Sequence, residues 1–169
     1  DFHEMRYGDA ADLAAKISER TAAVVLEAVR TDCDMAIPPV GYFDEVRRLC
    51  DRTGAKLIID EVVCGMGRLG RLWGCEYQGV EPDMLVTAKG FSGGVYPMSA
   101  VVTRPECLDF FGESPYRTIS SFAWSNLGAR VSHAALEETQ RLLPRLQPLG
   151  DEIERNVVTL QRRYPSALR

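Results

Sequence analysis

The stretch "AKLIIDEVVCGMGRLGRLWGCEYQGVEPDMLVTAKGFSGGVYP" (residues 55–97) contains two short apolar runs, and a charged residue closes each of them. Asp60 ends the first run, and Lys89 stands directly after the second. Glycines cluster behind both charges. Short apolar runs bounded by turn residues are typical of buried strands. The stretch therefore predicts two strands of one sheet, with a charged side chain at the carboxyl end of each.

The flanking segments extend this pattern into an α/β fold. Apolar runs of strand length also occupy residues 21–29 and 98–103. Strands that are apolar on both faces and separated by helices indicate a mostly parallel sheet flanked by helices on both sides. In such sheets ligands bind outside the carboxyl ends of the strands. The segments with helical character are 10–20, 42–54, 105–111, 126–143 and 149–164, the last two divided by the Pro144–Pro148 segment.

Composition narrows the class of protein. The chain has 169 residues, 46% hydrophobic and 26% charged, which suits about one globular domain. A net charge of −4 argues against a nucleic-acid surface. No apolar run is long enough to span a membrane, and the first residues lack the pattern of a secretory signal. The five cysteines form no C-x-x-C pair, which favours reduced thiols in a cytoplasmic protein. His3 and His133 are isolated, so no metal site is predicted.

Asp60 and Lys89 have two interpretations. Lysine is scarce here, at three residues against 17 arginines, so Lys89 is notable among the basic side chains. The carboxyl ends of parallel strands lie at the same edge of a sheet, so the two charged side chains can form a strand-end salt bridge there. Alternatively they serve one cofactor, because a lysine amine forms an imine with an aldehyde and a carboxylate keeps a pyridine nitrogen protonated. Pyridoxal phosphate requires both groups.

The order of the motifs resembles one enzyme family. An apolar strand leads into Asp-Glu-Val, then Gly-x-Gly-Arg-x-Gly (65–70), then Pro-Asp-x-x-x-x-x-Lys-x-x-x-Gly-Gly (82–94). This order resembles the class III pyridoxal-phosphate-dependent aminotransferases, over roughly residues 20–165. The resemblance implies the large domain of the fold type I of pyridoxal-phosphate-dependent transferases. "DEVVCGMGR" (60–68) is most similar to the subgroup that acts on ω-amino acids and amines with pyruvate.

The resemblance also implies roles for single residues. Lys89 matches the lysine that forms the internal aldimine and then shuttles the proton. Asp60 matches the carboxylate on the pyridine nitrogen, and Val62 the aliphatic residue packed on the ring. Ser121 matches the hydroxyl residue that reaches the cofactor phosphate of the neighbouring subunit. The family assignment therefore implies a homodimer with a shared active site.

Other positions keep open or unusual interpretations. Glu27 matches a glutamate that pairs with an arginine in some members, and Glu61 is either a second acid or a structural carboxylate. Val63 replaces a glutamine that in many members contacts the cofactor's 3′ oxygen. Trp124 stands where the family commonly has glycine.

The resemblance further implies a division of the chain. Residues 1–128 match part of the cofactor-binding large domain, and 129–169 match the connecting helix and the start of the small C-terminal domain. No Gly/Ser-rich turn for the cofactor phosphate is recognisable before residue 40. The arginine for a substrate carboxylate usually comes from the small domain. We therefore expect these 169 residues to be inactive alone.

The predicted function is transfer of an amino group from an amine or amino acid to a keto acid. Three alternatives stay open: an incomplete or non-catalytic scaffold with this fold, an aminomutase or decarboxylase relative, and a nucleotide-hydrolysing domain. The last rests on "KLIIDE" (56–61), but the G-x-x-x-x-G-K-[ST] motif that it requires is missing. The sequence does not identify the donor or the acceptor.

Overall fold

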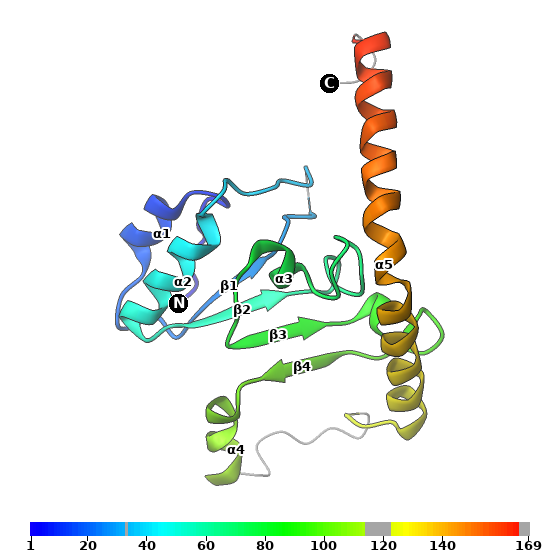
Figure 1. Cartoon of the computed structure of the whole chain (residues 1–169). Coiled ribbons are helices and arrows are strands. Elements are labelled where there is room, and N and C mark those ends of the chain that lie inside the picture. Colours follow the sequence, from blue (N-terminus) through cyan, green and yellow to red (C-terminus); the bar gives the residue numbers. More distant parts are fainter. Residues whose placement is uncertain (33, 114–122, 166–169) are drawn as a thin grey trace.

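The centre of the molecule is a four-stranded sheet in the order β1-β2-β3-β4 (Figure 1). The computed structural model describes residues 1–32, 34–113 and 123–165. β1, β2 and β3 are parallel, and β4 pairs antiparallel with β3 at the edge of the sheet. The mostly parallel sheet is thus confirmed. The strands are Ala23–Glu27, Lys56–Asp60, Met84–Thr87 and Ala100–Thr103.

Helices precede, separate and follow the strands. The C-cap of α2 is Gly54, whose φ of 78° lies in the left-handed region that favours glycine. At the start of α1, the Asp9 carboxylate accepts the Asp12 N–H at 2.9 Å. The helical elements are α1 (Ala10–Lys16), α2 (Tyr42–Thr53), α3 (Gly74–Gln78), η1 (Lys89–Ser92), η2 (Pro105–Leu108), α4 (Asp109–Glu113) and α5 (Asn126–Arg163).

The core lies on one face of the sheet. Side chains alternate along β2, so Leu57 and Ile59 are fully buried in a cluster that also includes residues of α1, α2 and α3. The opposite face carries Val25 and Val101, each 62% exposed. The expectation that helices cover both faces is therefore only half met within the described residues. This second face also carries Asp60.

Asp83 ties the sheet to α2. Its side chain is 8% exposed and accepts the Leu57 N–H and the Arg47 guanidinium, both at 2.8 Å. Burial opposes ionisation of Asp83, but these two donors outweigh it and lower the pKa of the carboxyl. Asp83 thereby links the start of β3 to β2 and α2.

α5 is one continuous helix, and the predicted break at Pro144–Pro148 is wrong. Each proline deprives the carbonyl four residues earlier of a hydrogen bond. Packing compensates, because a Cβ on Gly67 would lie 2.8 Å from Leu146 Cδ1, so the helix sits directly on this loop. Gln140 and Pro144, whose carbonyls lose these bonds, both line a groove of about 750 Å³ between α5 and the loop after Gly70.

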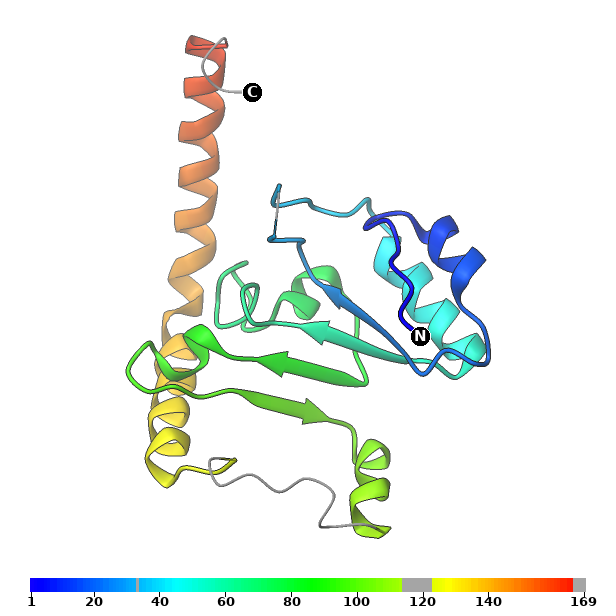
Figure 2. The same cartoon turned by 180° about the vertical axis from the view of Figure 1, so that it is seen from behind.

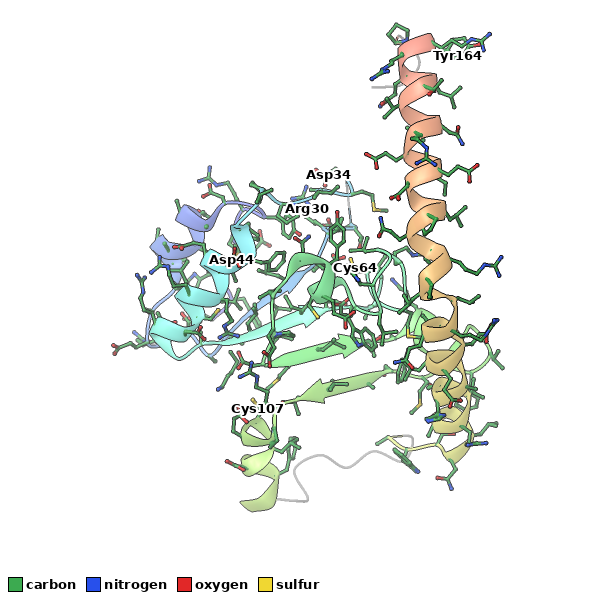
Figure 3. The ribbon with its side chains drawn as sticks, viewed as in Figure 1. Arg30, Asp34, Asp44, Cys64, Cys107 and Tyr164 are labelled. Carbon is green, nitrogen blue, oxygen red and sulfur yellow. The ribbon has the colours of Figure 1, made fainter. Side chains whose placement is uncertain are left out.

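Beyond these contacts, α5 extends past the rest of the molecule (Figure 2). Tyr164 lies near its far end, remote from the sheet (Figure 3). Apolar side chains in this half stay exposed, among them Leu149 at 52% and Ile153 at 55%. No helix in the described ranges combines the length and apolar character needed to cross a bilayer.

Candidate active site

A row of side chains crosses the open face of the sheet near its carboxyl edge. Glu27 pairs in register with Asp60, Asp60 with Val86, and Val86 with Val101. Residues in register on neighbouring strands project from the same face. Lys89 begins η1, just after β3 ends. Asp60 and Lys89 thus lie at the carboxyl ends of adjacent parallel strands.

Asp60 is half-buried and held by its own turn. One carboxylate oxygen, Oδ1, accepts the Val62 N–H at 2.8 Å. No hydrogen bond from a described residue reaches the other oxygen, Oδ2. The side chain therefore has a fixed orientation and one oxygen available for a ligand.

Lys89 is exposed and sits in a strained turn. Its φ is +48°, in the left-handed region that a long side chain rarely adopts. Gly93, with φ 61°, closes the turn by donating its N–H to the Gly90 carbonyl at 2.9 Å. Within the described part of the chain, Lys89 forms no ion pair with Asp60 or with any other carboxylate. The strand-end salt bridge is therefore not formed.

α5 supports the segment after the Lys89 turn. A Cβ on Gly128 would lie 2.9 Å from Met98 Sδ and 3.0 Å from the Tyr96 ring, so only glycine permits this approach. Ser125 donates its hydroxyl to Tyr96 Oη at 3.2 Å and accepts the Gly128 N–H at 3.1 Å. The start of α5 thus packs closely on the chain that follows Lys89.

Glu61 lies on the side of the sheet opposite to Asp60. It is 1% exposed, and its two carboxylate oxygens accept the N–H groups of Gly74 and Cys75, each at 2.7 Å. Burial raises the pKa of the carboxyl, and the two N–H donors act against that rise. Of its two open interpretations, this geometry favours the structural carboxylate.

The other positions singled out by the sequence have simpler surroundings. Val62 and Val63 are half-buried in the turn after β2. Trp124 is 72% exposed, and its indole N–H donates to Asn126 Oδ1 at 2.6 Å. Ser121 lies outside the described residues.

Near Glu27 the structure adds residues that the sequence did not reveal. The Glu27 carboxylate accepts the Thr31 N–H at 3.2 Å and the Thr31 hydroxyl. Tyr7 donates its hydroxyl to the backbone oxygens of Glu27 and Ala28, at 3.1 and 3.0 Å. Burial raises the pKa of Tyr7, which keeps this donor protonated. Only the spacing of Thr31 from Glu27 was visible in the sequence; Tyr7 is too distant along the chain for a local pattern.

No cluster of three metal-binding side chains occurs in the described ranges. Cys50, Cys64 and Cys75 are free, buried thiols, and Cys64 lies beside α3 (Figure 3).

Comparison with known proteins identifies the family. The model of the class III aminotransferase family matches residues 3–169. A protein of Archaeoglobus fulgidus, named as an uncharacterized aminotransferase, is 38% identical over 165 residues, which are 96% of this chain and 39% of that protein. The chain thus spans about two fifths of the length of this relative.

Solved structures agree. An ornithine aminotransferase from Toxoplasma gondii ME49 superposes with a TM-score of 0.88 at 29% identity, covering 99% of this chain and 39% of that one. An acetylornithine aminotransferase from Elizabethkingia anophelis gives 0.86 at 29% identity, over 94% of this chain and 42% of that one. A second structure of ornithine aminotransferase from Toxoplasma gondii gives a TM-score of 0.86 at 29% identity, over 95% of this chain and 37% of that one. That structure contains pyridoxal phosphate at partial occupancy. Because the family model matches residues 3–169 of its 169 residues, the chain belongs to the class III aminotransferases, whose cofactor is pyridoxal phosphate.

Proposed function

We propose that the protein is a transaminase that moves an amino group from an amine or amino acid to a keto acid, with Lys89 and Asp60 as its chemical groups. The observation that carries this proposal is their placement. They lie at the ends of adjacent parallel strands, and no ion pair joins them in the described part of the chain. A structural salt bridge would occupy both groups, whereas a cofactor site requires both to be accessible.

The residues present fit pyridoxal phosphate. When bound, this cofactor supplies an aldehyde carbon and a pyridine ring that withdraws the electron pair of the breaking Cα–H bond. Lys89 offers an exposed amine without an ion-pair partner among the described carboxylates. Asp60 offers Oδ2, while Oδ1 is held by the Val62 N–H. Val62, half-buried in the same turn, is the aliphatic residue that we assign to pack against the ring.

Each residue then has a distinct task. Lys89 Nζ would hold the cofactor at its aldehyde carbon and, when freed by the donor amine, would accept the proton from the substrate Cα. Asp60 holds a proton on the ring nitrogen, which stabilises negative charge in the transition state. Val62 orients the ring. The turn at Gly93 and Gly94 leaves space for the cofactor beside the backbone.

The complete site needs a second subunit in this proposal. Ser121 is assigned to the cofactor phosphate of the neighbouring protomer, so the working form is a homodimer. The free thiols of the described residues agree with the cytoplasm as its location.

The donor is proposed to be an ω-amino acid or amine, because Val63 and the following cysteine resemble that subgroup. Ornithine and acetylornithine are the alternatives that the names of the structural relatives supply.

Borohydride reduction tests the assignment of Lys89. The complete protein, loaded with pyridoxal phosphate and reduced, should carry the pyridoxyl group on the peptide that contains Lys89. Lys89→Arg should abolish this label. Lys56→Arg should retain it, because Lys56 begins β2 and so lies at the end of that strand opposite to Asp60. Label on another peptide, or none on a cofactor-loaded sample, would overturn the proposal.

A further inference from the structure

Glu61 connects three separate segments. Its carboxylate accepts the N–H groups of Gly74 and Cys75 at the start of α3, each at 2.7 Å. Its own N–H donates to the Val86 carbonyl in β3 at 2.7 Å, and its carbonyl accepts the Gly65 N–H at 3.0 Å. Side chain and backbone together join the end of β2 to β3, to the following turn and to α3.

The surroundings of Glu61 are built closely around it. A Cβ on Gly74 would lie 2.8 Å from Cys64 Cβ and 3.0 Å from Glu61 Oε2. A Cβ on Gly65 would lie 2.7 Å from the Glu61 carbonyl and 2.9 Å from the Trp73 ring. Both glycines are therefore required for α3 and the turn to enclose the carboxylate. Such close packing leaves Glu61 little freedom to move.

One hydrogen bond connects the turn that Glu61 holds in place to the Asp60 side chain. The turn from Glu61 to Gly65 contains Val62, whose N–H donates to Asp60 Oδ1 at 2.8 Å. Asp60 and Glu61 project from opposite sides of the sheet, so Glu61 touches nothing on the open face. The orientation of the Asp60 carboxylate still depends on where the turn places the Val62 N–H.

We propose that Glu61 is a positioning residue, which holds the turn so that the Val62 N–H fixes the Asp60 carboxylate toward the cofactor. This inference rests on the proposed function for the role of Asp60. Two N–H donors require two acceptor oxygens, and only a carboxylate provides both. A glutamine at this position would present its NH₂ group to one of the donors, which would loosen one of the two bonds.

The test compares two carboxylates at the same helix. Glu61→Gln removes one acceptor at the start of α3. Glu76→Gln is the matched control, because Glu76 is exposed and accepts the Trp73 N–H at 3.1 Å without contacting the turn. Amide hydrogen exchange is measured on the complete protein without cofactor. Glu61→Gln should accelerate exchange of the Val62 amide by roughly tenfold, together with the Gly74 and Cys75 amides. Glu76→Gln should leave the Val62 amide at the wild-type rate.

A second readout follows Asp60 itself. In protein loaded with ¹⁵N-labelled pyridoxal phosphate, the ring-nitrogen resonance reports whether that nitrogen is protonated. Glu61→Gln should shift it toward the unprotonated position, and Glu76→Gln should not. Faster exchange at Gly74 and Cys75 with an unchanged Val62 amide would show that Glu61 only caps α3, and would overturn the inference. An unchanged ring-nitrogen resonance in Glu61→Gln would also overturn it.

Glu61→Asp keeps the test decisive if Glu61→Gln does not fold. The shorter side chain keeps both acceptor oxygens but reaches the two donors less well, so Val62 exchange should increase by a smaller factor. Disturbed Gly74 and Cys75 amides with a wild-type Val62 rate in this variant would likewise contradict the inference. Failure of the proposed function would be seen separately, as absence of the reduced label on Lys89 in the wild-type protein, whereas Val62 exchange needs no cofactor.

Discussion

At the residue scale, Asp60 and Glu61 show how neighbouring carboxylates acquire different tasks. Successive side chains leave a strand on opposite sides, so Asp60 faces the open side while Glu61 is enclosed beneath α3. Asp60 keeps one oxygen accessible, whereas both oxygens of Glu61 accept backbone donors. Both residues are carboxylic acids, so what distinguishes Asp60 as the candidate chemical group from Glu61 is that only Asp60 has an accessible oxygen.

Asp60→Asn should separate cofactor binding from turnover. The amide still accepts the Val62 N–H but has no charge to hold a proton on the ring nitrogen. We expect cofactor binding to persist and kcat to fall by about a hundredfold or more. Steady-state kinetics on the complete loaded protein measure this. Glu27→Gln, in register with Asp60, is the control and should lose much less; near-normal turnover of the Asn variant would remove the role of Asp60.

At the element scale, α5 brings together features that the chain separates. Its first turns pack against Tyr96 and Met98, and its middle contacts Gly67. The same helix therefore supports both the segment after Lys89 and the loop after Asp60. Pro148 directly follows the last of these contacts, which Leu146 and Gln147 make with Gly67 and Gly70, so the half of the helix beyond it depends on fewer interactions.

Pro148→Ala should stabilise the exposed half of α5. Alanine restores an N–H for the Pro144 carbonyl, and interior proline is about 3 kcal/mol less favourable than alanine in a helix. Amide hydrogen exchange over residues 152–163 should slow. Arg145→Ala, an exposed neighbour in the same helix, is the control and should change these rates little. Equal exchange in the two variants would show that Pro148 costs this helix nothing.

At the scale of the whole molecule, one buried acid joins layers that no local pattern connects. Asp83 lies before β3, yet it holds β2 through Leu57 and α2 through Arg47. Both bonds are stronger to the ionised carboxylate than to the neutral acid, which is why the pKa of Asp83 is lowered despite burial. The free energy of unfolding should therefore depend on pH through the Asp83 carboxyl.

Asp83→Asn should destabilise the fold in a pH-dependent way. Because the folded-state pKa is depressed, Asp83 contributes its stability above the ordinary value of 3.8 and loses it as pH falls further. At neutral pH the variant should lose about 1–3 kcal/mol of unfolding free energy. Urea unfolding should show this difference shrinking in acid. Asp51→Asn removes an exposed partner of Arg47 and should cost much less; a loss independent of pH would contradict this account.

Much of the fold was predictable because its strands and helices follow from patterns of apolar and turn residues over a few positions. The four apolar runs correspond to β1 to β4 within a few residues, and the predicted helical segment 42–54 corresponds to α2 with Gly54 as its C-cap. The predicted break in α5 was wrong, because packing on Gly67 outweighs the local effect of proline. The edge direction of β4 and the open second face also lay beyond local patterning.

The sequence by itself determined that Asp60 and Lys89 close two apolar strands and that glycines follow each. Those features depend on alternation and turn chemistry, which act over a few residues. Only the tertiary structure decided that Glu61 is a buried support and that Lys89 forms no ion pair with Asp60 in the described part of the chain. Such outcomes depend on contacts between segments far apart in the chain, where close packing selects which groups become buried and paired.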